Sequence, residues 1–293
     1  MRTLLKISGV ALAVAAAAGP AQAERLFGLT AGNTIVTFDS STPGTTLTSG
    51  TITGLGTNVL TGIDQRPANR ELYSLSTTGN LFLIDKNASG RNYTAVLVGN
   101  VGVGFNGARF GIDFNPVPDR LRFVTDFDNN LRINPVGGAT IVDGTITADG
   151  AEALVGVAYT NSRPGATATT LYALDASGNE LLRSTNANLG TYVNTNLAGV
   201  AFGSLGVTLG GANTVGFDIS GGTGAAFFNV GSSLYSLNLT SGAATTIGTV
   251  GAGSLIGLTA GSVPEPAAWA LMIGGFGLVG AAMRRRGIAT VAA

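Results

Sequence analysis

The 293-residue chain contains no cysteine and no histidine. The lack of cysteine excludes disulfides, thiolate nucleophiles and iron–sulfur clusters. The lack of histidine excludes an imidazole base and a His-ligated zinc ion. Charged residues are also scarce, at 11% of the chain, whereas glycine alone contributes 45 residues.

The N-terminus has the composition of a secretory signal peptide. Two basic residues precede a short apolar run, and two alanines follow at the spacing of a cleavage site. These features are Arg2, Lys6, residues 7–18, Ala21 and Ala23. We therefore expect the Sec export machinery to translocate the chain and signal peptidase to remove residues 1–23, so that the mature protein begins at Glu24. A buried first helix of the fold is the alternative interpretation.

The C-terminal segment, residues 263–293, has the features of a second targeting signal. A Pro-Glu-Pro tripeptide precedes the apolar stretch 267–283, and three arginines follow that stretch directly. The tripeptide and the arginines are Pro264, Glu265, Pro266, Arg284, Arg285 and Arg286. As a helix the stretch would be about 25 Å long, slightly short of the hydrocarbon core of a bilayer. We expect it to span the inner membrane with the arginines in the cytoplasm, which places residues 24–262 outside.

The tripeptide, apolar stretch and arginine cluster, in this order, resemble the PEP-CTERM sorting signal of Gram-negative bacteria. The resemblance implies that an exosortase-type enzyme recognises the tripeptide and removes the tail. The anchor would then be transient, and the processed protein would reach the cell surface or the extracellular space. The resemblance also implies a link to exopolysaccharide and the biofilm matrix. A plain membrane anchor that is never cut is the alternative.

Removal of the N-terminal and C-terminal targeting signals leaves residues 24–262, here called the body, which are mildly acidic. Five of the 16 basic residues lie in the two targeting signals, and one of the 16 acidic residues, Glu265, lies in the C-terminal signal. The body thus keeps 11 basic and 15 acidic residues, a net charge near −4. Nucleic-acid binding requires a concentrated basic face. We therefore expect no nucleic-acid partner.

The sequence pattern of the body predicts an all-β fold made of repeats. Short runs of β-branched and aromatic residues alternate with clusters of Gly, Asn, Asp, Ser and Pro. A phrase of glycine, apolar strand, turn and two or three further strands recurs about every 40–60 residues. Its starting glycines are Gly62, Gly111, Gly156, Gly216 and Gly257. This spacing is typical of the four-stranded blades of a β-propeller.

The two ends of the body predict how the repeats close. Residues 26–52 are expected to form three strands that lack the first strand of a four-stranded repeat. Residues 255–259 are expected to form a first strand that lacks the other three. We expect these strands to share one sheet and to complete a fifth blade. Six blades are an alternative because residues 182–214 are poorly phased, and a β-sandwich with a β-helix-like extension is another. The body also resembles an uncharacterised family of bacterial secreted repeat proteins, with residues 111–116 and 158–162 as landmarks, and the resemblance supplies no catalytic residues.

Three aspartates form the first candidate site. Asp64, Asp113 and Asp218 each occupy the third position of a Gly-apolar-Asp phrase. On innermost strands they could face one end of a central channel and hold a metal ion or act as general acid and base. Alternatively each caps a turn, since Ala158 takes the same position in another repeat. Four arginines could pair with these acids or with an anionic sugar: Arg66, Arg120, Arg122 and Arg132.

A second candidate site places oxygen-bearing side chains at alternate positions. Asp126, Asp128 and Asn130 could present three ligands to calcium, the one cofactor that the sequence suggests. The segment departs from an EF-hand loop, which needs glycine and an acid where this chain has Leu131 and Gly137. A polar turn between two strands is the alternative.

These observations support three functional hypotheses. The leading one is a non-enzymatic exported module that binds polysaccharide or an envelope protein. The alternative is a calcium-dependent hydrolase or lactonase-like propeller enzyme with its metal in the central channel. A purely structural surface protein without a discrete ligand is the third.

Overall fold

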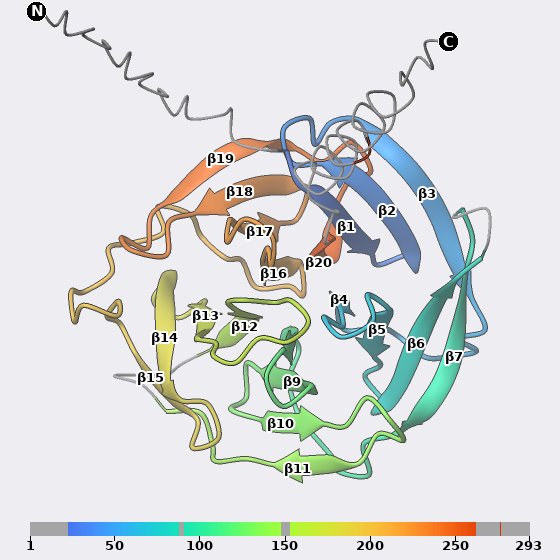
Figure 1. Ribbon diagram of the computed structural model, residues 1–293, viewed down its shortest axis with the longest axis horizontal. Helices are drawn as coiled ribbons and strands as arrows, with labels where there is room; N and C mark the ends of the chain where they lie inside the picture. The colour runs from blue at the N-terminus through green and yellow to red at the C-terminus, as the bar shows by residue number, and fades with distance from the viewer. Residues whose placement is uncertain (1–22, 88–90, 148–152, 262–275, 277–293) are drawn as a thin grey trace, which may run out of the picture.

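A computed structural model describes residues 23–87, 91–147, 153–261 and Phe276. Within residues 23–261, the described ranges form 20 β-strands joined by turns and loops, with no helix. The all-β prediction is therefore confirmed for this part of the chain. Figure 1 shows the strands in sets around a common centre, with β4, β12, β16 and β20 close to it and β3, β7, β11 and β19 at the periphery.

The strands form five antiparallel sets of four. The first set contains β20 (Leu255–Gly261), β1 (Arg25–Thr30), β2 (Thr34–Asp39) and β3 (Thr46–Thr53). The second contains β4 (Asp64–Gln65), β5 (Leu72–Leu75), β6 (Asn80–Lys86) and β7 (Tyr93–Asn100). The third contains β8 (Phe110–Asn115), β9 (Arg120–Thr125), β10 (Asn130–Ile133) and β11 (Thr140–Val142). A short parallel pairing of β3 with β7 joins the first two sets into one eight-stranded sheet.

Two separate sheets complete the body. The fourth set contains β12 (Leu154–Tyr159), β13 (Leu171–Asp175), β14 (Glu180–Asn186) and β15 (Thr191–Val193). The fifth contains β16 (Val215–Ile219), β17 (Ala226–Val230), β18 (Ser233–Leu237) and β19 (Ala244–Thr249). Each set runs in chain order from its inner to its outer strand, apart from the first, whose inner strand comes from the C-terminal end of the body.

The first and last strands of the body pair with each other, as the sequence predicts. β1 and β20 are antiparallel, with Leu26 opposite Ala260, Phe27 opposite Thr259 and Gly28 opposite Leu258. Leu26 and Leu258 are buried, so the pairing also contributes to the core. The chain thus closes on itself through backbone hydrogen bonds, without a disulfide.

The innermost strands touch one another in a closed cycle. β4 contacts β8, β8 contacts β12, β12 contacts β16, β16 contacts β20, and β20 contacts β4. The glycine that opens each repeat makes this approach possible. A Cβ atom on Gly216 would lie 2.2 Å from the backbone nitrogen of Leu258, and one on Gly257 would lie 2.8 Å from that of Ile63. A side chain at either position would push neighbouring strands apart.

The apolar core lies between neighbouring sets rather than inside one of them. In one cluster Tyr172 and Leu174 of the fourth set meet Phe217 and Phe228 of the fifth. Four further clusters fill the other junctions between sets. Each sheet therefore buries its two faces against its two neighbours, and none has an apolar core of its own.

The poorly phased segment between β15 and β16 does not form a further set of strands. From Val193 to Val215 the described chain has only isolated bridges, including Thr195 with Ala201. Phe202, Leu205 and Leu209 from this segment are buried in the cluster between the fourth and fifth sets. The segment is thus a core-filling connection.

The two predicted targeting signals lie almost entirely outside the described residues. Of the cleavage-site residues only Ala23 is described, and of the predicted membrane span 267–283 only Phe276 is. The sorting residues 264–266 and 284–286 also lie outside the described part. Within the described ranges, no helix has the length and hydrophobicity needed to cross a membrane.

Candidate functional site

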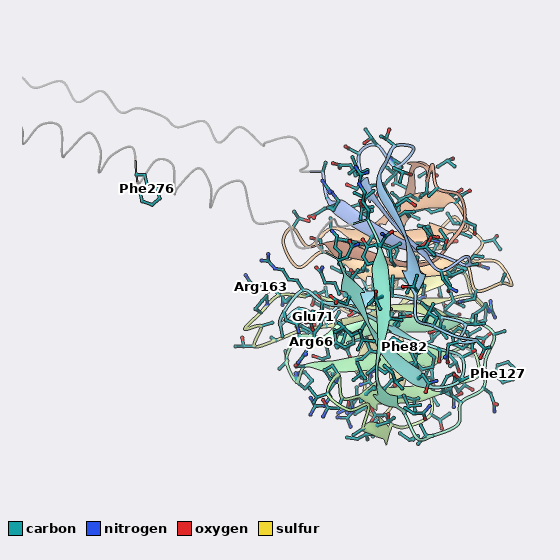
Figure 2. All side chains as sticks on the ribbon, turned by 90° about the vertical axis from the view of Figure 1, so that its right-hand side faces the viewer. Arg66, Glu71, Phe82, Phe127, Arg163 and Phe276 are labelled. Atoms are coloured by element: carbon teal, nitrogen blue, oxygen red, sulfur yellow. The ribbon has the colours of Figure 1, made fainter. Side chains whose placement is uncertain are left out.

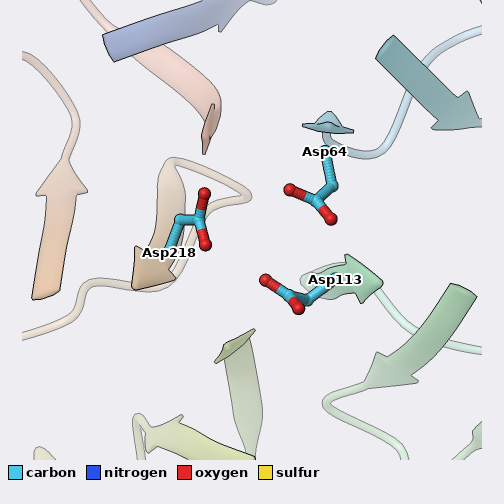
Figure 3. A group of neighbouring side chains, drawn as sticks. All are labelled: Asp64, Asp113 and Asp218. Carbon is cyan, nitrogen blue, oxygen red and sulfur yellow. The ribbon is translucent and has the colours of Figure 1, made fainter. Parts of the chain in front are cut away.

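Asp64, Asp113 and Asp218 meet at the centre of the molecule. They lie on β4, β8 and β16, one inner strand from each of three sets. Each offers a carboxylate oxygen within 4.8 Å of those of the other two, and Figure 3 shows the three side chains pointing toward a common point. Their exposed fractions are 2%, 1% and 4%. The structure therefore brings the three predicted carboxylates together, and it buries them.

The other two inner strands supply Ala158 and Thr259 at the equivalent position. Both are fully buried. The Thr259 hydroxyl lies 2.9 Å from Asp64 Oδ1 and 2.8 Å from Asp218 Oδ2. Sequence reasoning missed Thr259, although Gly257 and Leu258 before it repeat the glycine–apolar phrase that precedes the aspartates. Five equivalent positions thus carry three carboxyls, one hydroxyl and one methyl group.

Each carboxylate also accepts a backbone N–H from the next inner strand. Asp64 Oδ2 accepts from Phe114 on β8 at 2.7 Å, and Asp113 Oδ1 accepts from Tyr159 on β12 at 3.2 Å. Asp218 Oδ2 accepts from Ala260 on β20 at 2.6 Å. These contacts agree with one part of the alternative interpretation, that each aspartate satisfies backbone N–H groups. The side chains satisfy backbone donors of the neighbouring set, and Asp218 Oδ1 also accepts from the Ile219 N–H of its own strand at 2.6 Å.

Burial raises the pKa of all three carboxyls. For Asp64 the second cause is the charge of Asp218, and for Asp113 the charges of Asp64 and Asp218 follow burial. For Asp218 burial raises the pKa against the lowering effect of the Ala260 N–H. No Lys or Arg is among the main causes of these shifts. One oxygen, Asp113 Oδ2, is buried without a hydrogen-bond partner.

The free space near the centre of the molecule is very small. A cavity of about 10 Å³ lies among the inner strands, and its lining includes Gly62, Gly111, Gly156, Gly216 and Gly257 and the apolar residues beside them. This volume accommodates about one water molecule. The walls of this cavity are glycines and apolar side chains, and none of the three aspartates lines it.

The four arginines, for which the sequence left open a pairing with these acids or with an anionic sugar, have other protein partners, so they do not pair with the three aspartates. Arg66 pairs with Asp119, and Arg120 donates to the backbone carbonyls of Pro118 and Asp119. The physical reason is that Asp119 supplies Arg66 with a carboxylate partner and that Arg66 and Arg120 are both partly exposed to solvent.

Arg122 and Arg132 form a separate buried network that sequence reasoning missed. They lie opposite each other on β9 and β10, and both contact Asp143 at 2.6 Å. Arg122, which is 1% exposed, also donates to Asn130 and Asn188. The available signal was two like charges in register on adjacent strands, because such a pair needs a shared acid.

Asp126, Asp128 and Asn130 lie at the turn between β9 and β10 and at the start of β10. Asp126 accepts the Ala108 N–H and pairs with Arg109 at 2.9 Å. Asn130 accepts from Arg122 and donates to the carbonyls of Gly144 and Ala187. Asp128 has a φ of 62°, in the left-handed region. These contacts favour the polar-turn interpretation.

Two hollows open at the surface. The first, of about 260 Å³, is bounded by β1, β4, β5 and β6, and its lining includes Phe27, Gln65, Arg70, Glu71, Asp85 and Lys86. The second, of about 370 Å³, lies between the fourth and fifth sets, and its lining includes Thr160, Asn161, Arg163, Ser220 and Thr223. Figure 2 shows Glu71 of the first hollow and Arg163 of the second on the same side of the molecule, with Phe127 on the opposite side.

Comparison with solved structures gives only distant similarity. A protein of unknown function from Bacteroides caccae is 12% identical, with 76% of this chain and 72% of that chain covered and a TM-score of 0.38. Glutaminyl cyclase from Myxococcus xanthus is 14% identical, with 71% and 90% covered and a TM-score of 0.42. A protein of unknown function from Bacteroides thetaiotaomicron is 15% identical, with 77% and 58% covered and a TM-score of 0.44. None of these similarities is close enough to support a functional argument.

Comparison with family models is informative, whereas no curated protein matches the chain. A model of the PEP-CTERM protein-sorting motif matches residues 262–286, which confirms the resemblance seen in the sequence and implies export and processing by an exosortase. A second model matches residues 34–259, nearly the whole body. The chain therefore belongs to the family described as a domain of unknown function, DUF4394, and carries a C-terminal PEP-CTERM sorting motif.

Proposed function

We propose that this protein is an exported five-bladed β-propeller that binds polysaccharide at the cell surface or in the extracellular matrix. Five antiparallel sets of four strands, inner strands in a closed cycle of contacts and the pairing of β1 with β20 support the propeller architecture. This arrangement leaves the loops at the two ends of the axis free to bind a ligand.

The sorting motif supports the proposed location. In this proposal residues 267–283 hold the chain in the inner membrane, with the body outside the cytoplasm, until the exosortase cuts near Pro264–Pro266. The processed protein then reaches the surface or the matrix, where polysaccharide is the abundant polymer. The acidic body suits a neutral sugar chain or one bridged by cations.

The first hollow is the observation that carries the polysaccharide proposal. Its lining combines the aromatic ring of Phe27, the carboxylates of Glu71 and Asp85, and the donors of Arg70 and Lys86. Sugars expose apolar C–H faces and hydroxyl groups that both donate and accept, so this mixture of groups matches them. Arg70 has a φ of 65°, an uncommon conformation for a residue other than glycine, and such conformations cluster at functional sites.

The hydrolase alternative receives less support. An enzyme of that kind would need its substrate to reach the three central carboxylates, which are at most 4% exposed. The cavity among the inner strands, of about 10 Å³, is far smaller than a sugar ring or a lactone. We therefore assign ligand binding to the surface hollow and leave the centre a supporting role.

A glycan screen tests this proposal. The full chain, produced with its export signal in a Gram-negative host and purified in detergent, is applied to arrays of bacterial exopolysaccharides, and hits are measured by titration calorimetry. We expect Glu71→Gln to weaken binding at least tenfold, because it removes a charged acceptor from the first hollow. Arg163→Ala, a change in the second hollow, serves as the matched control and should bind as the parent does. Absence of any glycan hit, or equal losses in both variants, would contradict the assignment.

A further inference from the structure

We propose that Asp64, Asp113 and Asp218 hold a structural calcium ion on the axis of the molecule. This inference is independent of the surface hollow and of any polysaccharide. It concerns what stabilises the closed ring of inner strands.

The first argument is the balance of charge. Three carboxyl groups lie within 4.8 Å of one another and are almost completely buried. The ion pairs found in the described part of the chain all involve other acids, namely Asp119, Asp126 and Asp143. Buried charges are normally paired with a counter-charge or coordinated to a metal. No protein cation does so here within the described residues.

The second argument is an unsatisfied oxygen. Asp113 Oδ2 has no hydrogen-bond partner, although the residue is only 1% exposed. Figure 3 shows the Asp113 carboxylate directed toward those of Asp64 and Asp218. Buried polar atoms in native proteins nearly always have a partner. The Asp113 carboxyl can pair with that of Asp218 only if the two share a proton or a cation, and the proposal assigns the cation.

The third argument is the Thr259 hydroxyl. It lies within hydrogen-bond distance of both Asp64 Oδ1 and Asp218 Oδ2, yet it has a single proton to donate. One of the two contacts therefore needs a proton on the carboxyl or a cation shared among the oxygens. The same hydroxyl could serve as a neutral ligand of that cation.

The donor set selects the kind of ion. Every available ligand is an oxygen, and such sites prefer calcium or magnesium to softer metals. Magnesium requires nearly octahedral ligands at about 2.0–2.1 Å and usually keeps several of its waters. Calcium accepts irregular carboxylate sets at about 2.3–2.6 Å, so ligands on opposite sides of the ion lie up to about 5 Å apart. The spread of the three carboxylates fits calcium.

The ion would join strands that are distant in sequence. Asp64, Asp113 and Asp218 belong to the second, third and fifth sets, and Thr259 belongs to the first. A single calcium would therefore tie four of the five sets together at the axis. It would stabilise the folded chain because the ligands are far apart in the unfolded one.

Calcium titration of the full chain tests the proposal. The protein, purified in detergent and freed of metal with EDTA, is titrated with calcium and then with magnesium, and unfolding is followed by scanning calorimetry. We expect one calcium per chain and a rise in Tm of roughly 5–10 °C at a hundredfold excess over Kd. Asp113→Asn should lose this rise. Asp175→Asn, which changes a buried aspartate that is bonded to Ser177 and Gly178, should keep it.

Two outcomes would overturn the proposal. One is a parent protein whose Tm and heat signal do not respond to calcium, which would mean that protons satisfy the cluster. The other is a calcium response that survives in Asp113→Asn, which would place the ion elsewhere. If Asp113→Asn does not fold, Thr259→Val provides the second variant, and we expect it to weaken calcium binding at least threefold.

Discussion

The residues with the greatest energetic weight are buried charges, and they fall into two groups. Around Asp143, two arginines and their amide partners balance one another. Around Asp113, three acids lie together without a basic partner among the described residues. The group around Asp143 links the third set of strands to the fourth. The group around Asp113 can bind a cation or protons.

Loss of the Asp143 carboxylate should destabilise the fold strongly. Asp143→Asn keeps the shape of the side chain but leaves buried Arg122 without its counter-charge, so we expect a loss of about 3–5 kcal/mol in the free energy of unfolding. Urea unfolding measures it. Asp119→Asn is the control, because its pair with Arg66 is partly exposed and is worth about 1 kcal/mol or less. Equal effects of the two changes would show that the Asp143 network is not important for stability.

The three central carboxyls should give the metal-free protein an unusual dependence on pH. Their pKa values in the folded chain are raised above the ordinary 3.8, chiefly by burial. The folded chain therefore retains protons that the unfolded chain releases, and the stability that these groups contribute is lost as the pH rises from about 4 through the raised pKa values.

Unfolding in EDTA at a series of pH values checks this sign. Between about pH 5 and about pH 8 we expect the free energy of unfolding of the parent to fall more steeply than that of Asp113→Asn, because the variant has one fewer such group. Parallel curves would mean that the pKa of Asp113 is the same in the folded and unfolded chains.

Among the elements, the inner strands depend most on one residue type. The glycine that opens each repeat lets adjacent inner strands approach closely, so its role is packing between sets rather than turn geometry. Gly216 is the tightest case, since an added Cβ would lie 2.2 Å from backbone.

Gly216→Ala should therefore cost at least about 2 kcal/mol in the free energy of unfolding, as overpacked cores do. Gly211→Ala is the matched control in the loop just before β16, because nothing lies within 4 Å of a Cβ atom there. Thermal unfolding compares them, and a Gly216→Ala chain as stable as the control would show that the inner strands can separate without cost.

Repeats made the inner strands predictable from the sequence. The phrase Gly-apolar-Asp recurs, so three aspartates at equivalent positions had to lie on the same layer once the repeats were arranged around an axis. The partners of Arg122 were not predictable in this way. Asp143 and Asn188 lie in loops after β11 and β14, and nothing in their local sequence indicates which sheet they face. The segment between β15 and β16 was likewise ambiguous, because its buried Phe202, Leu205 and Leu209 have no strand periodicity.

At the scale of the whole molecule, stability depends on closure. Every apolar cluster lies between two sets, so removing one set would expose a face of each neighbour. The first set is assembled from both ends of the body, and β20 is its inner strand. Folding of the body should therefore be cooperative and should require that residues 25–30 meet residues 255–261.

The most direct test of this claim is scanning calorimetry of two shortened chains that both begin at Glu24. One ends at Gly261, the last residue of β20, and the other ends at Ser254, just before it. We predict that the longer chain unfolds in one sharp transition. The shorter chain should lack such a transition, because β1 keeps β2 but loses the inner strand β20, and Asp218 loses the Ala260 N–H. A shorter chain that unfolds as sharply, and at the same Tm, as the longer one would contradict closure through β1 and β20.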